Sequence, residues 1–164
     1  MNRHRTAIKL TERLRVEHQV FRQILDLIEI SLSLPREPAA LELRVALRIL
    51  QPSLEDHERL EDRYLFPGFK RKAGGALLQE YSGTHRDIWK TLRYLREALD
   101  EDAAPGTIRA AAERLVFVLR EHMLEEERVL FPAVEAALGE EALLALSVRA
   151  AAASRRGSVL EGAR

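Results

Sequence analysis

Residues 122–132 read HMLEEERVLFP, and residues 57–67 read HERLEDRYLFP. Both stretches begin with a histidine, carry a glutamate four residues later and end in Leu-Phe-Pro. Residues four apart lie on one face of an α-helix, about 6 Å apart along its axis. The repeated pattern therefore predicts two helices that each present an imidazole and a carboxylate on the same face.

The repeat extends beyond these two stretches. His18 precedes His57 at nearly the same interval at which His85 precedes His122. Each half of the chain is thus expected to hold a helix with one histidine, a loop, and a second helix with His-x-x-x-Glu. A unit that occurs only twice indicates a duplicated helical hairpin that closes on itself with pseudo-twofold symmetry, in contrast to an open solenoid.

Helix breakers divide the chain into four long segments with apolar residues spaced three and four apart, which is typical of amphipathic helices. The breakers fall at 35–38, 70–75, 100–106 and 138–140. We expect long helices at 11–34, 39–66, 76–99 and 107–131, and a shorter fifth helix at 140–155, before a frayed end. Long helices with short connections favour an all-α, up-down-up-down four-helix bundle. The whole chain, 1–164, is expected to be a single domain with its core bundle at about 11–134.

The expected core stripes are formed mainly by leucine. They comprise Leu14, Phe21, Leu25, Ile28 and Leu32, then Leu43, Leu47, Leu50 and Leu54, then Ile88, Leu92, Leu95 and Leu99, and finally Leu115, Val118 and Val129. Pro52 lies inside the second segment and predicts either a kink or a break, with Ser53 available to cap a restarted helix.

Composition narrows the functional classes. The 164 residues contain 26 Lys plus Arg and 26 Asp plus Glu, so a basic nucleic-acid or membrane-binding surface is not expected. The chain has no cysteine, which excludes disulfides and thiolate metal sites. No apolar run resembles a signal peptide or a membrane span, so a cytoplasmic location is expected. The sequence does not indicate an oligomeric state.

The histidines and glutamates form the candidate site. Four of the five histidines, His18, His57, His85 and His122, fall in the core stripes of four separate helices, and Glu61 and Glu126 share two of those faces. A single such histidine is more often a hydrogen-bonded core residue. A carboxylate in an apolar core is costly unless it is paired or binds a metal. Four imidazoles and two carboxylates together therefore predict a metal site suited to iron, or to zinc, nickel or copper.

Other polar residues near this pattern are given simpler interpretations. His4, Glu125, Glu127 and the basic runs at 70–72 and 154–156 are expected to be solvated. Tyr64 lies one turn beyond Glu61 and is expected to pack in the core with a polar tip. Trp89 is expected to pack over the site and limit access to it. Phe66 and Phe131 are expected to close helix ends before Pro67 and Pro132.

The doubled motif resembles the hemerythrin-like family, also called the HHE cation-binding domain, over about residues 11–134. The resemblance implies a four-helix bundle with a carboxylate-bridged centre of two iron ions. It also implies a ligand set of His18, His57, Glu61, His85, His122 and Glu126. The Glu-x-x-His motif of ferritin-like bundles and the His-Glu-x-x-His motif of zinc proteases are both absent.

One position departs from the oxygen carriers of this family. They have a fifth histidine one turn after the first histidine of the third helix, where this chain has Trp89. The chain is more similar to the four-His, two-Glu members, which are linked to iron-centre repair, nitric oxide and peroxide handling, and iron sensing. The resemblance thus implies a redox-active protein whose iron meets dioxygen, peroxide or nitric oxide, with Glu58 or water able to fill an open position. Two alternatives stay open: a non-catalytic module that senses or stores iron or oxygen, and a bundle holding zinc or no metal. Whether the protein is an enzyme is not decided by the sequence.

Overall fold

The computed structural model describes residues 8–161, except for the side chains at 76, 77, 80, 82 and 154–161. His4 and the side chains of the basic run at 154–156 lie outside the described residues. Within the described range the chain is helical and contains no strand. Its elements are α1 (Leu10–Ser31), α2 (Arg36–Leu60), the π-helical turn η1 (Glu61–Leu65), α3 (Phe66–Ala73), α4 (Ala76–Asp100), α5 (Pro105–Glu125), the π-helical turn η2 (Glu126–Leu130) and α6 (Phe131–Glu161).

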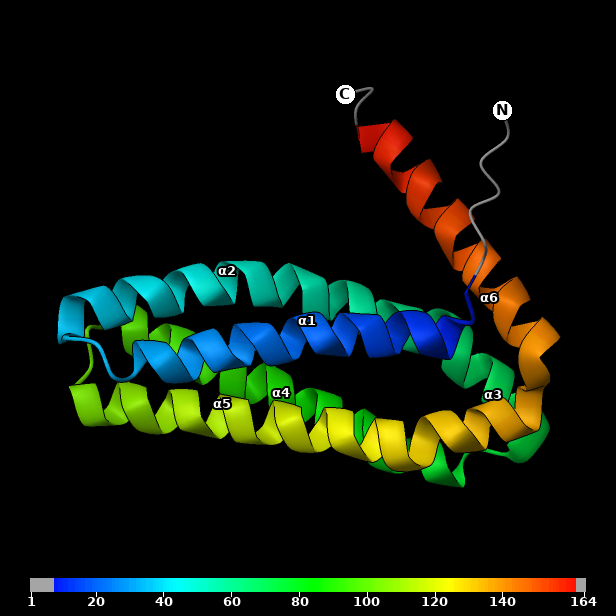
Figure 1. The fold of residues 1–164 in the computed structure, drawn as a ribbon, viewed down its shortest axis with the longest axis horizontal. Helices are drawn as coiled ribbons and strands as arrows, with labels where there is room; N and C mark the ends of the chain where they lie inside the picture. The colour runs from blue at the N-terminus through cyan, green and yellow to red at the C-terminus, as the bar shows by residue number, and fades with distance from the viewer. Residues whose placement is uncertain (1–7, 162–164) are drawn as a thin grey trace.

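Four long helices form an antiparallel bundle, which confirms the predicted up-down-up-down architecture. Helix α1 packs against α2 and α5, and α4 packs against the same two helices, so the four helices close into a ring. Figure 1 shows α1, α2, α4 and α5 running side by side in alternating directions. Short connections at 32–35 and 101–104 link the helices of each hairpin at one end of the bundle.

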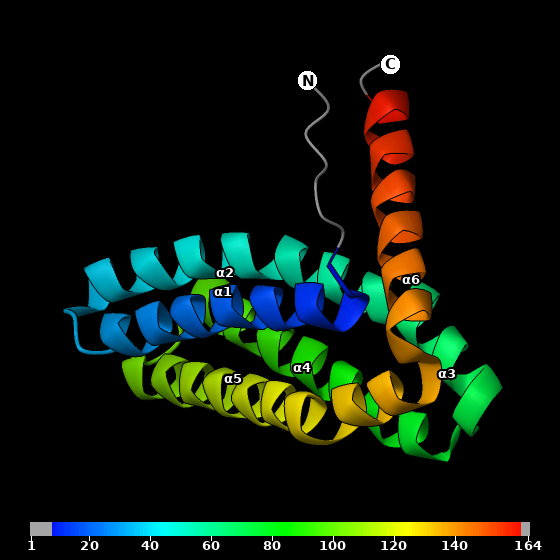
Figure 2. The same ribbon diagram turned by 45° about the vertical axis from the view of Figure 1, so that its right-hand side comes forward.

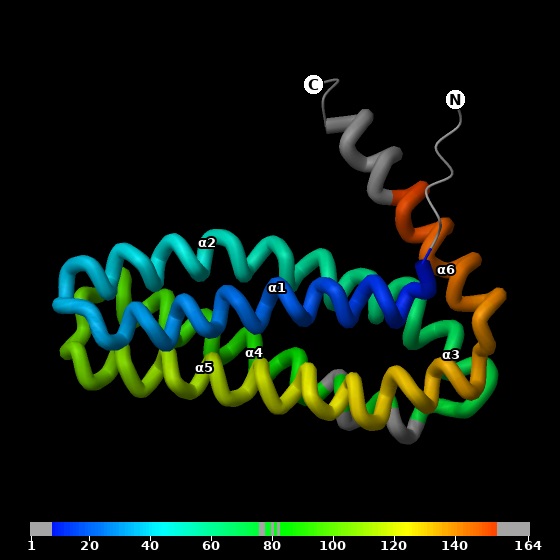
Figure 3. The backbone as a smooth tube through the Cα atoms, viewed as in Figure 1, coloured from blue at the N-terminus to red at the C-terminus, as the bar shows by residue number. Residues whose placement is uncertain are grey.

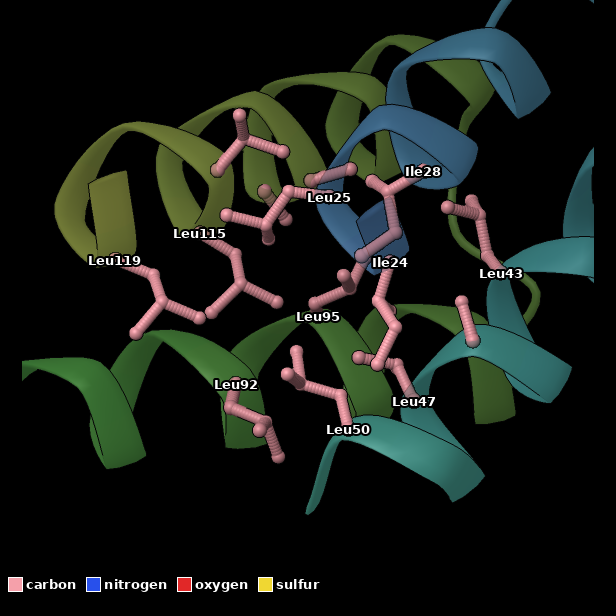
Figure 4. Packing of buried hydrophobic residues seen from close by; sticks show 14 of the residues in the cluster. Ile24, Leu25, Ile28, Leu43, Leu47, Leu50, Leu92, Leu95, Leu115 and Leu119 are labelled. Carbon is pink, nitrogen blue, oxygen red and sulfur yellow. The ribbon is translucent and has the colours of Figure 1, made fainter. Parts of the chain in front are cut away.

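The core consists of two apolar clusters. The larger cluster fills the part of the bundle nearest the hairpin loops, and Figure 4 shows Leu25, Leu50, Leu95 and Leu115 pointing into it from four different helices. The smaller cluster lies at the opposite end, where Leu14, with others from α1, packs against residues of η1, α3, η2 and α6. All predicted stripe residues of the first three helices are buried or partly buried in these clusters.

Pro52 neither breaks nor ends its helix. Helix α2 continues through it to Leu60, and the Ser53 hydroxyl donates to the carbonyl of Ile49 at 2.9 Å. Ser53 therefore binds a carbonyl of the preceding turn, and it does not cap a restarted helix. Such a back-bond is common for serine inside helices and tends to bend them.

The last helix leaves the axis of the bundle. Gly139 has φ 75° and ψ 169°, a left-handed backbone conformation that favours glycine, and it kinks α6 where the sequence predicts a break. Beyond this kink α6 turns away from the four long helices, as Figures 1 and 2 show. The tube in Figure 3 follows the described part of this arm past the start of α1. The arm carries buried Leu143, Leu146 and Ala150 and extends the smaller cluster.

Candidate metal centre

The six candidate ligands form a polar layer between the two apolar clusters. His18 lies between Leu14 of the smaller cluster and Phe21 of the larger one, and His57 is bounded in the same way by Leu54 and Leu60. All six candidate ligands are buried. Their exposed fractions are 0% for His18, 1% for His57, 0% for Glu61, 7% for His85, 3% for His122 and 0% for Glu126. The structure thus brings together, inside the protein, all six residues that the sequence singles out.

Each glutamate opens a π-helical turn. The backbone N–H of Phe66 donates to the carbonyl of Glu61, and that of Phe131 donates to the carbonyl of Glu126, so both bonds span five residues. Pro67 follows the first turn and Pro132 the second. Proline lacks an N–H and its ring collides with the carbonyl four residues back, and a widened turn accommodates both effects without ending the helix. The helices predicted to end at residues 66 and 131 therefore continue as α3 and α6.

The widened turns also shift the helical register by one residue. Val129 was expected in the core stripe, but it is 50% exposed, and Leu130 is fully buried in its place. The first repeat shows the same shift, because Leu65 is buried where an uninterrupted α-helix places Tyr64. Tyr64 packs at the edge of the smaller cluster and makes no hydrogen bond to a described residue. Its packing role is as expected.

The histidines form two pairs, one in each hairpin. The Nε2 atoms of His18 and His57 lie 3.2 Å apart, which joins α1 to α2. The rings of His85 and His122 approach edge to face with centroids 5.0 Å apart, which joins α4 to α5. Each pair therefore comes from one copy of the repeated hairpin, and the pseudo-twofold symmetry of the two copies stays a prediction.

Glu126 reaches both pairs through different oxygens. Its Oε2 lies 3.2 Å from His18 Nε2 and 4.0 Å from His57 Nε2, whereas its Oε1 lies 3.2 Å from His122 Nε2. One carboxylate therefore spans the two histidine pairs.

Glu61 has the equivalent arrangement. Its Oε1 lies 3.7 Å from His57 Nε2 and its Oε2 lies 3.2 Å from His85 Nε2. Among the described residues, potential ligand atoms gather in two groups, Glu61 with His85, His122 and Glu126, and His18 with His57 and Glu126. The geometry is that of two neighbouring positions, each next to two imidazoles, with both carboxylates at the His85/His122 position and Glu126 alone grouped with the His18/His57 position.

Several atoms that face these positions are buried and have no hydrogen-bond partner among the described residues. They are both oxygens of Glu61, both oxygens of Glu126, and the Nε2 atoms of His85 and His122. An unpaired buried polar atom costs about 1–3 kcal/mol, and more when the group is charged. Six such atoms directed at one place fit a bound cation, which would accept their lone pairs.

The pKa values reflect strong coupling among these groups. Burial works to lower the pKa of His57, but the carboxylates of Glu61 and Glu126 raise it to about 10. Burial, together with the neighbouring carboxylate of Glu126, raises the pKa of Glu61 to about 7. Burial and the nearby histidines lower the pKa of His122 to about 4. The protein alone thus holds protons in this layer at neutral pH.

The outward-facing ring nitrogens have partners that the sequence interpretation missed. His18 Nδ1 lies 2.9 Å from Glu127 Oε1, and His57 Nδ1 lies 3.0 Å from Glu17 Oε2. Thr84 Oγ1 lies 3.2 Å from His122 Nδ1. The expectation that Glu127 is solvated is wrong, because its carboxylate is held against His18, whereas Glu125 is exposed as expected. The available signal was positional, since Glu17 and Thr84 each immediately precede the first histidine of their repeat.

Trp89 and Glu58 form a hydrogen-bonded pair beside the layer. The indole N–H of Trp89 donates to Glu58 Oε2 at 2.6 Å, while Glu58 Oε1 is buried without a partner. Burial raises the pKa of Glu58. Trp89 packs against the larger cluster and lines two open surface hollows, one shared with Glu58 and the other with Lys90. That Trp89 limits access to the layer stays a prediction.

An all-α bundle with a buried layer of histidines and carboxylates is the class of protein that the fold and the site define. The model of the Hemerythrin HHE cation binding domain family matches residues 9–143. The chain therefore belongs to this family, and the match and the buried cluster together point to metal binding. Searches of curated proteins and of solved structures found no match. Among the described residues, no helix is long and apolar enough to cross a membrane.

Proposed function

We propose that the chain holds a carboxylate-bridged non-heme diiron centre that binds or reacts with dioxygen, peroxide or nitric oxide. The observation that carries this proposal is that each of the two glutamates lies between the two histidine pairs. Glu61 and Glu126 each approach both histidine pairs through separate oxygens, and none of these oxygens has a hydrogen-bond partner in the part of the chain that the structure describes. A bridging carboxylate serves two ions at once, and such ions are about 3.5–4 Å apart in two-metal sites.

The proposed ligands divide between two ions. One ion would bind His18 and His57, the other would bind His85 and His122, and Glu61 and Glu126 would each give one oxygen to both. Mixed imidazole and carboxylate ligands suit iron, and also zinc and other divalent metals. With four protein ligands for each ion, coordination positions stay open to small molecules. Iron supplies electron transfer to and from such molecules when it is bound.

The chain's own residues prepare the layer for this role. Glu17 and Glu127 accept the Nδ1 protons of His57 and His18, which leaves the Nε2 atoms free for metal. Thr84 donates its hydroxyl hydrogen to the carbonyl of Tyr81 at 2.7 Å, so it accepts the Nδ1 proton of His122. The apolar clusters on either side exclude water from the layer. With Trp89 in place of a fifth histidine, no further imidazole from α4 fills a coordination position.

Metal counting and optical spectroscopy test the proposal. The purified protein should bind about two ferrous ions anaerobically, as expected for a two-metal site. Air, peroxide or nitric oxide should then produce a charge-transfer band. A content below one iron per chain after loading, or a spectrum that does not change with any oxidant, would refute the diiron centre.

A matched pair of variants separates turnover from simple binding. If the protein turns peroxide over, His57→Ala should abolish peroxide consumption, whereas Asp62→Ala, an exposed carboxylate nearby, should retain it. If neither the wild type nor Asp62→Ala consumes peroxide although iron is bound, the non-catalytic alternative of sensing or storage is favoured.

A further inference from the structure

We propose that the two halves of the centre hold their ions unequally, so that the His18/His57 position retains its ion and the His85/His122 position exchanges its ion first. This inference rests on the proposed diiron function and concerns the residues behind the ligands. The duplication provides its own reference, because every residue around one pair has a matched position around the other.

The first matched position is the residue before the first histidine of each repeat. Glu17 precedes His18 and reaches across to Nδ1 of His57 at 3.0 Å. Thr84 precedes His85 and reaches across to Nδ1 of His122 at 3.2 Å. The two contacts are geometrically equivalent, but one acceptor is a carboxylate and the other is a neutral hydroxyl.

The second matched position is the residue after each bridging glutamate. Glu127 follows Glu126 and lies 2.9 Å from Nδ1 of His18. Asp62 follows Glu61, is one methylene shorter, and is exposed. Within the described part of the chain, Asp62 makes no hydrogen bond and Nδ1 of His85 has no hydrogen-bond partner. At Nδ1, therefore, both histidines of the first pair contact a carboxylate, whereas Nδ1 of His122 contacts a hydroxyl and Nδ1 of His85 contacts no described residue.

Two arginines of α1 keep the carboxylates in place. Arg13 Nε lies 3.0 Å from Glu17 Oε1, and Arg22 lies 2.8 Å from Glu127 Oε1. A carboxylate that accepts the Nδ1 proton fixes the orientation of the ring and makes Nε2 a stronger donor to metal, and loss of such a partner typically costs about 10–100-fold in metal affinity. The His18/His57 position therefore binds its ion more tightly.

Burial favours the same order. His18 is 0% exposed and His57 is 1% exposed. The ring of His18 stacks on Phe131 with centroids 5.5 Å apart, and the ring of His57 meets Phe21 edge to face with centroids 5.2 Å apart. His85 is the most exposed of the four, at 7%.

The aromatic packing around the second pair is correspondingly looser. His85 stacks on Phe66 at 6.1 Å, and the position matching Phe21 holds the aliphatic Ile88. Water and chelators therefore reach the His85/His122 position more easily. The His18/His57 position is expected both to bind its ion more tightly and to be less accessible to chelators.

A release experiment tests the order of exchange. Protein loaded anaerobically with ferrous iron is mixed with excess of a coloured ferrous chelator, and release is followed by absorbance. Two phases of equal amplitude are expected. His85→Ala should remove the fast phase, and His18→Ala should remove the slow phase. Release of two ions in a single phase would overturn the inference while leaving the diiron proposal intact, whereas failure to load iron would overturn the diiron proposal itself.

Variants of the carboxylates that contact Nδ1 test whether these carboxylates cause the slower release. Glu17→Gln and Glu127→Gln should each accelerate the slow phase about tenfold or more and leave the fast phase unchanged. Glu125→Gln, which alters an exposed neighbour of the same chemistry, should change neither phase. Acceleration of the fast phase by Glu17→Gln or Glu127→Gln would contradict the assignment.

A gain-of-function variant guards against variants that merely fold poorly. Asp62→Glu restores the missing methylene at the position matching Glu127, so it should slow the fast phase severalfold by reaching Nδ1 of His85. An unchanged fast phase in Asp62→Glu would count against the carboxylate as the source of the difference.

Discussion

Removal of the Glu61 carboxylate, a proposed bridge, should separate metal binding from folding. In Glu61→Ala the lost side chain is fully buried, and both of its oxygens lack a hydrogen-bond partner. Truncation leaves a cavity, which for large buried side chains costs about 2–5 kcal/mol. It also removes two unpaired polar atoms, each of which costs about 1–3 kcal/mol. These effects oppose each other, so the free energy of unfolding of the metal-free protein should change by less than about 2 kcal/mol.

The metal-bound protein should respond much more strongly. An ion present at 100 times its Kd stabilises the folded state by about 2.7 kcal/mol, so two ions contribute about 5 kcal/mol. For a chain of this size each kcal/mol moves Tm by about 2–4 °C, so ferrous iron should raise the Tm of the wild type by roughly 10–20 °C. Glu61→Ala removes one ligand from both ions, and most of this rise should disappear.

The assay is thermal unfolding by circular dichroism with and without ferrous iron under anaerobic conditions, together with a metal count. Asp62→Ala is the matched control, because it removes an exposed carboxylate from the same π-helical turn. The control should keep the full metal-dependent rise. A Glu61→Ala protein that binds two ions and retains the rise would refute the bridging role.

Three further measurements address protons, backbone and access. The pKa is raised to about 7 for Glu61 and to about 10 for His57, so iron must displace protons when it binds. Iron binding should therefore release protons, and the affinity for iron should rise from pH 6 to pH 8. An affinity that falls over this range would contradict the ligand set. Gly139→Ala should lower the free energy of unfolding by about 1–2 kcal/mol in urea titrations, since φ is 75° and an added Cβ meets nothing within 4 Å; no loss would mean that the kink relaxes. Trp89→Phe should lower stability by about 1–2 kcal/mol in the same assay because Glu58 loses its indole donor, with exposed Tyr94→Phe as the unaffected control.

The sequence was sufficient to predict the bundle and the six residues of the buried layer. An α-helical period carries each histidine to a glutamate four residues later. The N–H of Glu61 donates to the carbonyl of His57 and that of Glu126 to the carbonyl of His122, so each pair is still joined by an α-helical hydrogen bond. The alternation of breakers and apolar stripes was sufficient for the topology.

The same periodicity failed immediately beyond the glutamates. Pro67 and Pro132 were interpreted as helix ends, whereas a turn closed by a bond over five residues lets each helix continue. Val129 was assigned to the core because the prediction assumed a constant period of 3.6 residues. Each proline is evident in the sequence, but whether the helix ends there or continues through a widened turn depends on packing. Here the widened turn places Leu65 and Leu130 in the core, where both are buried.

The residues that contact the outward-facing nitrogens of the histidines were not predicted, for a different reason. Glu17 contacts a histidine of the neighbouring helix, and Glu127 contacts one from the other hairpin. Such contacts depend on the rotation of packed helices relative to one another, which a pattern within one helix does not contain. Comparison of the two repeats position by position was the one signal that could have separated Glu127 from Glu125.

The π-helical turn before Pro132 influences which side chains face the buried layer. Successive side chains in an α-helix diverge by about 100°, and a turn that closes over five residues holds more residues, so its side chains diverge by less. This allows two consecutive glutamates to approach one imidazole, with Glu126 at Nε2 and Glu127 at Nδ1 of His18. Pro67 follows the same winding in the other repeat, where Asp62 is exposed and makes no hydrogen bond to a described residue. In the proposed centre, the duplication would provide the matched ligands, and the length of the side chain after Glu61 and Glu126 would make its two halves unequal.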